Sequence, residues 1–446
     1  MKAATSIREL PNSLLPNYPL RQGEDDEFYV PLYEEEIEAL QDSILNDNIS
    51  AQTLFVAGQT GTGKTTALHF LPNDEIKEAY EVVYLNAKEA FDVTDVTAIE
   101  ILIMICYKLM QYDSKLEQEF FDEVEKLDKV QQGILEHSKT RTSEFKTELG
   151  AGARLGLSGS PIGNFLKLFK LSTDFFASLI LSADYRAVTR EAFRINPQEL
   201  VKITNRIVDR FIQIVAKEKK LLVIINELDH IRSPKLIEGI FIDDIELIKK
   251  VGCKKVISVP VTLLKESEFK NFTKHFCIKL NVNPLASGLS SMTKEQIAYN
   301  YDILRKIIRR RIDSSVTLIE DHMIDQAIEA SGGIVRQYLS ILHEAARHAR
   351  RKKGAKINDL NLKEGKDVYR QMLERSIVLS SNKIDLLNEI RLDHQYERRE
   401  EREKIVVQCL LGNQIIVYMN DPTWYSINPL IEETVRIYAE KRKTAS

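Results

Sequence analysis

Short hydrophobic runs alternate with longer amphipathic segments over roughly the first 260 residues of the chain. The runs are rich in aliphatic and β-branched residues and are short enough to be strands; they cover residues 53–58, 81–87, 221–226 and 255–261. The segments between them carry apolar residues at helical spacing. Strands that alternate with helices are typical of a parallel sheet with helices on both faces, so the sequence predicts an α/β fold.

Two changes in this pattern indicate further parts of the chain. Between residues 112 and 195 a charged helix, a Gly/Ser-rich patch and an apolar segment interrupt the alternation, which indicates a helical insertion. After residue 290 the apolar positions follow a helical period, and the C-terminal helices lead into two alternating strands around the turn Asn420-Asp421-Pro422. The predicted units are an N-terminal arm at 1–33, a sheet domain at 34–290, a helical lid at 291–356 and a winged-helix-like domain at 357–446.

One apolar segment, residues 165–182, has nearly the length that a membrane span needs. Lys167, Lys170 and Asp174 interrupt it, and three ionisable residues inside a span would be costly. We therefore predict an amphipathic buried helix at this position and no association with a membrane.

The composition is that of a globular protein, with 43% hydrophobic and 29% charged residues. A net charge of −4 gives no general attraction to nucleic acid, so any such binding must be local. The amino terminus lacks the apolar core of a secretory signal, which predicts a cytoplasmic protein. The four cysteines show no metal-binding spacing and are expected to be buried free thiols: Cys106, Cys253, Cys277 and Cys409.

A glycine-rich motif follows the first predicted strand and opens a predicted helix. It fits G-x-x-x-x-G-K-[ST] at every fixed position, which predicts a P-loop that binds the phosphates of ATP or GTP. Lys64 is expected to bridge the β- and γ-phosphates, and the Thr65 hydroxyl to ligate Mg²⁺. The residues expected at the phosphates of ATP are Gly58, Gln59, Thr60, Gly61, Thr62, Gly63, Lys64, Thr65 and Thr66.

A second motif ends the predicted strand at 221–226, where Asn226-Glu227-Leu228-Asp229 follows the buried run. The motif resembles a Walker B motif, in which an acidic residue orients Mg²⁺ and the next residue activates the attacking water. Here Asn226 stands at the metal position and Glu227 at the position of the catalytic base. An amide oxygen contributes no negative charge, so we expect weaker metal binding and slower turnover.

Two further polar positions are candidates for contacts with the nucleotide. Thr262, and less strongly Ser258, lie at the end of the last long strand, where a polar residue can reach the γ-phosphate, although polar strand ends are common. Residues 331–336 form a Gly turn that opens a helix and places Arg336 toward the nucleotide. That turn resembles the sensor-2 motif of AAA+ proteins; the alternative is a plain turn with an arginine in solvent.

Together these motifs resemble the additional-strand, catalytic-glutamate ATPases of the AAA+ and STAND-like branch, which includes origin-recognition initiators and many bacterial defence ATPases. The resemblance covers about 28–350: LLVIINELDHI is similar to the hhhhDELD signature of the branch, and YSINPLI is similar to the end of its winged-helix units. It implies that residues 29–33 border the adenine. The chain departs from AAA+ rings in having no arginine between Ser233 and Leu304, where an arginine finger usually lies. Lys265, Lys270 and Lys274 lack the fork that matches a transition-state phosphate.

Two basic clusters, at 305–311 and 347–353, could bind phosphate backbones or could be solvated helix faces. His343 and His348 are spaced at i and i+5, which does not make a zinc site. The leading hypothesis is therefore a slow ATPase that acts as a nucleotide-dependent switch or assembly factor, through self-association or a partner effector, with phage defence suggested by family analogy alone. The alternatives are a DNA-binding initiator or transposition-type ATPase and a scaffold that binds nucleotide without hydrolysing it.

Overall fold

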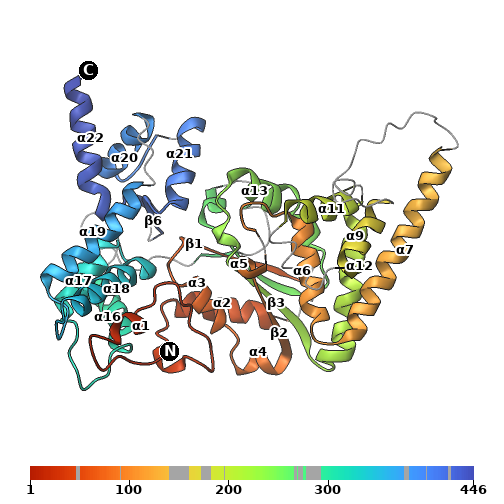
Figure 1. Cartoon of the computed structure of the whole chain (residues 1–446), viewed down its shortest axis with the longest axis horizontal. Coiled ribbons are helices and arrows are strands. Elements are labelled where there is room, and N and C mark those ends of the chain that lie inside the picture. The colour runs from red at the N-terminus through yellow and green to blue at the C-terminus, as the bar shows by residue number, and fades with distance from the viewer. Residues whose placement is uncertain are drawn as a thin grey trace.

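The computed structural model places a parallel sheet between an insertion on one side and a lobe of lid and wing helices on the other (Figure 1). The residues that the structure describes are 1–46, 51–90, 92–139, 160–171, 182–194, 196–265, 269, 275–277, 293–375, 381–397, 399–419 and 423–445.

The sheet has five strands in the order β2-β3-β4-β1-β5, and every neighbouring pair is parallel. The strand β4 lies between β1, which leads into the P-loop, and β3, which leads into the second motif. This is the additional strand that the family resemblance implies, so the predicted fold class is confirmed. The strands are β1 (Thr53–Gly58), β2 (Tyr80–Asn86), β3 (Lys220–Asn226), β4 (Lys254–Pro260) and β5 (His275–Cys277).

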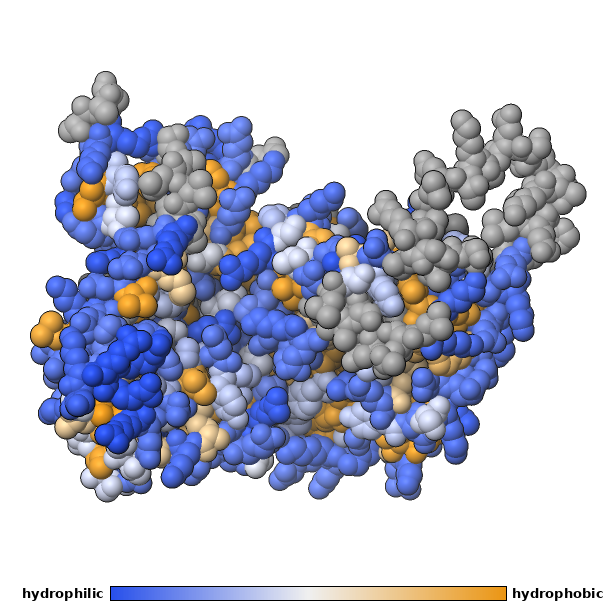
Figure 2. Space-filling model, in the orientation of Figure 1, coloured by the Kyte–Doolittle hydropathy of each residue, from blue (hydrophilic) through white to orange (hydrophobic). Residues whose placement is uncertain are grey.

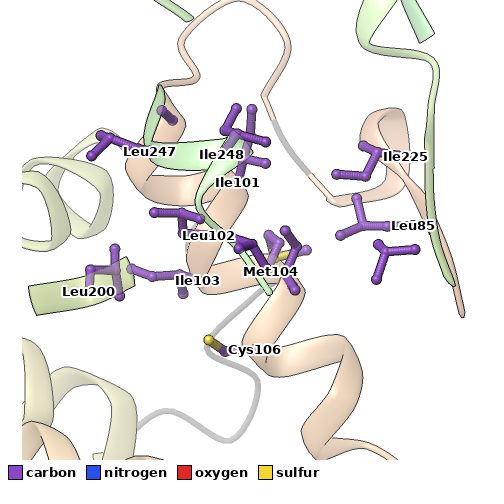
Figure 3. Packing of buried hydrophobic residues seen from close by; sticks show 14 of the residues in the cluster. Leu85, Ile101, Leu102, Ile103, Met104, Cys106, Leu200, Ile225, Leu247 and Ile248 are labelled. Carbon is purple, nitrogen blue, oxygen red and sulfur yellow. The ribbon is translucent and has the colours of Figure 1, made fainter. Parts of the chain in front are cut away.

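Helices cover both faces of the sheet because successive strand residues point to opposite sides. One face of β3 presents Val223 and Ile225 to a large core, where Ile225 and Leu85 face α6 (Figure 3). The other face presents Leu222 and Ile224 to a smaller core. The first face is covered by α6 (Ala98–Met110), α12 (Pro197–Phe211) and α14 (Ile245–Lys249), and the second by α2 (Glu34–Leu45), α3 (Lys64–His69) and α4 (Asp74–Ala79).

Two of the helices that cover the sheet are interrupted by π-helical turns. The helix α13 (Pro234–Glu238) continues as a π-helical turn over Gly239–Asp243, and α14 begins after Asp244. The helix α12 ends at Phe211 and continues as a π-helical turn over Ile212–Ala216. A continuous hydrophobic period does not reveal such one-residue insertions, because the buried face is nearly preserved on both sides of them.

The insertion packs beyond α6 and α12 as α7 (Ser114–Lys139), α9 (Pro161–Leu171) and α11 (Ala183–Phe193). Its helices meet through an aromatic cluster in which Phe120, Phe165 and Phe169 contact one another at centroid distances of 5.7–6.4 Å. The segment predicted as a buried helix is described up to Leu171, where Phe165 is fully buried; residues 172–181 lie outside the described part.

Within the described ranges, no helix is long and apolar enough to cross a membrane. The face drawn in Figure 2 carries its hydrophobic residues in small patches separated by hydrophilic ones.

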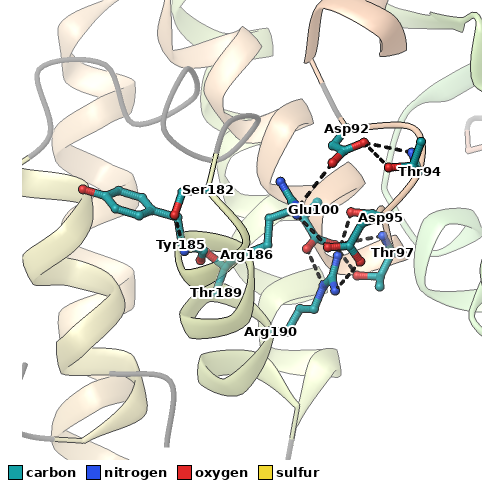
Figure 4. Close-up of polar contacts among 10 residues, drawn as sticks. All are labelled: Asp92, Thr94, Asp95, Thr97, Glu100, Ser182, Tyr185, Arg186, Thr189 and Arg190. Atoms are coloured by element: carbon teal, nitrogen blue, oxygen red, sulfur yellow. Dashed lines mark hydrogen bonds and ion pairs between the residues drawn. The ribbon is translucent and has the colours of Figure 1, made fainter. Parts of the chain in front are cut away.

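A charged network ties the insertion to the loop before α6 (Figure 4). Arg190 on α11 pairs with Glu100 (Nε–Oε1, 2.6 Å) and with Asp95 (Nη1–Oδ1, 2.8 Å), and Arg186 pairs with the second oxygen of Asp95 (2.8 Å). Burial raises the pKa of Glu100, and the charge of Arg190 acts in the opposite direction. The ion pair between Arg190 of the insertion and the buried Glu100 carboxylate therefore joins the insertion to the core, and Arg190 supplies the counter-charge of that carboxylate.

The lid and the winged-helix-like part share one hydrophobic core, which also takes in the N-terminal arm. The two parts approach closely where α18 meets α19: a Cβ on Gly365 would lie 2.4 Å from the carbonyl oxygen of Ile341. The helices are α16 (Lys294–Arg309), α17 (Asp321–Ala330), α18 (Val335–Arg351), α19 (Asp359–Arg375), α20 (Ser381–Asp393), α21 (Glu400–Leu411) and α22 (Glu432–Ala445). The antiparallel hairpin β6 (Ile415–Tyr418) and β7 (Trp424–Ile427) supplies the predicted wing; residues 420–422 of its turn are not among those described.

The arm contains a short helix α1 (Leu10–Ser13) and a 3₁₀ turn at Asp26–Phe28. Its beginning lies on the lid, where the Ala4 N–H donates to the Arg311 carbonyl (2.9 Å). Its middle lies on the P-loop helix, where Leu20 N–H donates to Thr66 Oγ1 (3.2 Å). The arm thus connects the lid with the sheet domain.

We predict that Arg190→Met lowers the free energy of unfolding by at least about 3 kcal/mol, because it leaves the Glu100 carboxylate buried without a counter-charge. Denaturant unfolding of the full chain measures the change. Arg194→Met, at the exposed end of the same helix, is the matched control and should change stability by less than about 0.5 kcal/mol. Equal effects of the two substitutions would contradict the assignment.

Candidate functional site

The P-loop leaves β1 at Gly58 and enters α3 at Lys64. Gly61 and Gly63 both have φ +95°, a backbone conformation that L side chains rarely adopt. At Gly61 there is also no room: an added Cβ would lie 3.0 Å from Ile334 Cγ2 and 3.1 Å from Arg336 Cβ. Glycine is therefore required here both for the turn and for the close approach of the lid.

Lys64 is buried, and its ammonium group has three partners. Nζ donates to the carbonyls of Gly58 (2.8 Å) and Gln59 (2.9 Å) and pairs with Asp229 Oδ2 (2.9 Å). Burial acts to raise the pKa of Asp229, but the charge and hydrogen bond of Lys64, together with the charges of His230 and Arg336, hold that pKa below its ordinary value. Lys64 is thus held within the loop by a carboxylate, and a phosphate must replace these partners to bind it.

Glu227 follows β3 in the left-handed region, with φ +65°. A non-glycine residue there costs on the order of 1 kcal/mol. Its carboxylate lies 3.4 Å from the Thr65 hydroxyl (Oε1–Oγ1) and 3.7 Å from Lys88 Nζ. The strained turn therefore brings the predicted base next to the predicted Mg²⁺ ligand on the P-loop helix.

Asn226 ends β3 beside His69, the last residue of α3, with its Nδ2 3.3 Å from His69 Nε2. His69 Nδ1 lies 2.8 Å from the Leu20 carbonyl, which can only accept, so Nδ1 carries the proton and Nε2 accepts from Asn226. Burial lowers the pKa of His69, which keeps the ring neutral. Asn226 Oδ1 is then left buried with no hydrogen-bond partner among the described residues.

These oxygen atoms fit a hard divalent cation. Mg²⁺ takes hydroxyl, carboxylate and carbonyl oxygens and keeps several of its waters. The Thr65 hydroxyl and the Glu227 carboxylate adjoin each other, and the unpartnered amide oxygen of Asn226 could accept from metal-bound water. Among the described residues, neither this site nor any other gathers three or more His, Cys, Asp or Glu side chains that could hold a metal.

A cleft of about 660 Å³ lies between the P-loop, the arm and the lid. Four cationic side chains line it, from Lys64, Lys88, Arg311 and Arg336, against the two carboxylates of Glu227 and Asp229. The lid enters the cleft at Arg336, whose N–H donates to the Gly61 carbonyl (3.0 Å). The excess of cations suits a polyanion.

A second, more apolar cavity of about 420 Å³ adjoins the cleft. Its walls include Tyr29, Leu32 and Tyr33 from the arm, within the range expected to border the adenine. Tyr29 is stacked on Phe70 (ring centroids 3.8 Å apart), and Tyr33 donates to the Thr62 carbonyl (2.6 Å). Two adjoining cavities, one cationic and one apolar, match the two ends of a nucleotide.

The structure does not bring Thr262 to the cleft. Its hydroxyl is buried beyond β4 without a described partner, and Thr262 is not part of the cleft's lining. Ser258, the weaker candidate, donates to Asp229 Oδ1 (3.2 Å) and so touches the partner of Lys64. The polar contact at the end of β4 therefore comes from the residue that the sequence favoured less.

Gln59 turns away from the cleft and joins the P-loop to the wing. Its Nε2 donates to the Ile415 carbonyl (2.8 Å), and its Oε1 accepts from the Val417 N–H (3.1 Å). The carboxamide thus pairs with the outer edge of β6 as a neighbouring strand would. Tyr418 adds a bond from its hydroxyl to the Gly332 carbonyl (2.8 Å), which seats the hairpin against the lid turn.

The basic cluster at 305–311 is largely neutralised within the lid. Arg305 pairs with Asp325 (Nε–Oδ1, 2.6 Å), and Arg309 pairs with Asp321 (Nη2–Oδ2, 2.7 Å). The second cluster retains exposed cations at the end of α18, at Arg350, Arg351 and Lys353.

Sequence reasoning missed the roles of Asp229, Lys88, Arg311 and the contact of Gln59 with the wing. Asp229 had a signal, since it lies in the second motif. The 3₁₀ turn Leu228–His230 folds it back toward Lys64. The sequence gives no signal for the positions of Lys88 and Arg311 in the cleft or for the contact of Gln59 with the wing, because each depends on how segments distant in the sequence pack.

The sequence matches no family model and no curated protein. Among solved structures, the ORC2 protein of Aeropyrum pernix, in ADPNP–ADP complexes, aligns over 96% of this chain and 100% of its own with 12% identity and a TM-score of 0.44. The Walker-type ATPase of Pyrococcus abyssi aligns over 95% and 99% with 14% identity and a TM-score of 0.46. The A. pernix ORC1 protein, in complex with DNA, aligns over 95% of both chains with 12% identity and a TM-score of 0.43.

His230 gives the site a pH dependence. Burial lowers its pKa to about 4, and Asp229 opposes this shift only in part. Because the unfolded histidine titrates near 6.5, the unfolded state binds the proton first, and stability falls as the pH drops from about 6.5 toward 4. We predict that His230 accounts for a loss of about 2 kcal/mol between pH 8 and pH 5.

Denaturant unfolding of wild type and His230→Gln at both pH values measures this contribution as the difference between their pH slopes. His322→Gln, at an exposed position on the lid, is the control and should leave the slope unchanged. Parallel slopes for wild type and His230→Gln would refute the prediction.

Proposed function

We propose that this chain, which has the P-loop ATPase fold of the AAA+ branch with a winged-helix-like C-terminal part, binds ATP with Mg²⁺ and acts in the cytoplasm as a slow nucleotide-dependent switch. The observation that carries the proposal is that two residues of the P-loop contact the wing and the lid. Gln59 bonds the wing, and Gly61 accepts from the lid at Arg336.

Binding is supported by the charge and shape of the cleft. Lys64, Arg336 and the amide groups of the loop present positive charge to one end of an elongated double cavity. Lys64 would leave Asp229 and the loop carbonyls for the β- and γ-phosphates. Mg²⁺ would be held through Thr65 and, by water, through Asn226 and Glu227, and would supply charge stabilisation to the phosphates.

Switching follows from the partners that Lys64 must give up. One of them is the carbonyl of Gln59, the residue whose side chain holds β6. A change of the loop backbone on phosphate binding therefore reaches the wing through a single residue. A ligand can shift such an equilibrium only by its different affinity for the two arrangements, and the Lys64 contacts provide that difference.

Slow hydrolysis is supported by the uncharged side chain at the metal position. Glu227 remains to act as general base toward a water, but Asn226 gives the metal no negative charge. The missing arginine between Ser233 and Leu304 points the same way, because no arginine from that stretch can stabilise the transition state.

We predict that Lys64→Ala weakens ATP binding at least about 100-fold, since it removes the cation expected at two phosphates. Isothermal titration with Mg²⁺-ATP measures this, and Lys202→Ala, an exposed lysine on α12, should stay within about twofold of wild type. Because Asp229 loses its counter-charge in that variant, the double variant Lys64→Met/Asp229→Asn is measured too. An ATP affinity equal to that of wild type in a folded double variant would refute the proposal.

The switch has its own readout in the same samples. Amide hydrogen exchange at residues 415–417 should change when ATP is added to wild type and should not change in the double variant. Nucleotide binding without any change at these residues would leave a nucleotide-binding protein that is not a switch of this design.

We predict that Glu227→Gln lowers steady-state phosphate release at least about 100-fold while ATP still binds, because it removes the base. Asn226→Asp should act in the opposite direction and lower the Mg²⁺ concentration for half-maximal release about tenfold. Asn226→Leu, of similar size, is the control for loss of the amide. Phosphate release that is absent in wild type would favour the non-hydrolysing scaffold instead.

The DNA-binding alternative depends on the exposed cations at Arg350, Arg351 and Lys353, since Arg305 and Arg309 of the first basic cluster are ion-paired, and the outer edge of β6 is bonded to Gln59. Salt-dependent retention of duplex DNA on filters would support it. A partner effector, and phage defence as its setting, rest on family analogy. The molar mass of the chain with and without ATP separates self-association from a requirement for a second protein.

A further inference from the structure

Arg311, two residues after the end of α16, lies where the two cavities of the candidate site meet. Four residues line both cavities: Gly63, Thr66, Arg311 and Val335. One cavity holds the P-loop cations and the other the aromatic residues of the arm. In a nucleotide, the part between the triphosphate end and the base is the α-phosphate with its ribose.

The Arg311 side chain is buried but incompletely paired. Only 4% of the residue is exposed. Among the described residues, its guanidinium donates one hydrogen bond, from Nη1 to the Ile307 carbonyl (2.7 Å), while the buried Nε has no partner. A guanidinium has five N–H donors and stays charged at neutral pH, so this site lacks acceptors and an anion.

Among the residues that the structure describes, no carboxylate forms an ion pair with the Arg311 guanidinium. Two acidic groups act on Arg311, first the phenol of Tyr338, whose pKa burial raises so that it carries no charge at neutral pH, and then the carboxylate of Asp25. Asp25 is already occupied: its oxygens accept from the terminal ammonium of Met1 (2.9 Å), from the Tyr18 hydroxyl (3.1 Å) and from the Arg21 N–H (3.1 Å). Burial lowers the pKa of the guanidinium, as expected for a charge without a close counter-ion.

We propose that Arg311 is a nucleotide ligand that binds the α-phosphate, through Nε and a second N–H, and so fixes the junction between base and phosphates. The inference rests on the proposed function, because it assumes that the double cavity holds a nucleotide. It assigns a second arginine of the lid to the site, separate from Arg336, which lies against the P-loop at Gly61. Bound nucleotide would thereby hold the lid at two points.

A merely structural role makes a different prediction. If Arg311 served only to cap the carbonyl of Ile307, its loss would weaken the folded state and affect every ligand alike. As a ligand for the α-phosphate, it should matter for each nucleotide that has this group and not for the nucleoside.

The test is competition of ATP, ADP, AMP and adenosine against a fluorescent ADP analogue, on the full chain of wild type and Arg311→Gln. We expect Arg311→Gln to weaken ATP, ADP and AMP by one common factor, on the order of tenfold to a hundredfold, and adenosine by less than about twofold. Lys64→Ala should instead weaken ATP and ADP more than AMP. Arg309→Gln, an ion-paired neighbour outside both cavities, is the control.

Thermal unfolding without nucleotide completes the test. Removal of an unpaired buried charge should leave the melting temperature of Arg311→Gln unchanged or higher. Unchanged AMP affinity in Arg311→Gln, or an equal loss for adenosine and AMP, would overturn the inference while leaving the proposed function intact. Failure of wild type to bind any of the nucleotides would instead overturn the proposed function.

Discussion

The buried ammonium group of Lys64 sets the arrangement of the site. A buried lysine must be paired, and here Asp229 and two loop carbonyls supply the partners. These bonds hold the loop in a shape in which Gln59 points to the wing and the Gly61 carbonyl points to the lid. The sheet domain, the lid and the wing therefore all meet at the P-loop, whose shape depends on the partners of one buried charge.

The arm has a comparable role on the opposite side of the loop. Leu20 bonds both Thr66 and His69 of the P-loop helix, while Ala4 bonds the lid at Arg311. The Leu20 carbonyl fixes the tautomer of His69, so that His69 Nε2 accepts a hydrogen bond from Asn226 Nδ2 and orients the Asn226 side chain. A segment without long regular structure thus orients the side chain at the metal position.

Much of the fold could be predicted from the sequence because the signals are local. Strands β1, β3 and β4 are buried, largely aliphatic runs, and the P-loop has a fixed spacing of glycines that its backbone demands. The pairing of β4 between β1 and β3 followed only from the family resemblance, since periodicity does not specify strand order. The π-turns after α12 and α13 gave no signal, because one extra residue per turn scarcely alters a hydrophobic period.

The residues of the candidate site likewise fall into those that the sequence predicts and those that it does not. Lys64, Thr65 and Glu227 were found from motifs, and the structure places Thr65 and Glu227 within 3.4 Å of each other. Arg311 could not be found, because in the sequence it is one of several basic residues, five of them within 305–311. What distinguishes it is burial: Arg305 and Arg309 face carboxylates at the surface, whereas Arg311 enters the core between the cavities.

The contrast between the paired surface arginines and the buried Arg311 indicates which kind of ligand the site suits. A guanidinium removed from water costs far more free energy than one paired at a surface, so an anion that bound to Arg311, as we propose, would stabilise the folded arrangement. Asn226 presents the complementary case, a buried acceptor without a donor. The nucleotide with hydrated Mg²⁺ that we propose would meet both needs, with its α-phosphate at Arg311 and a metal-bound water at Asn226.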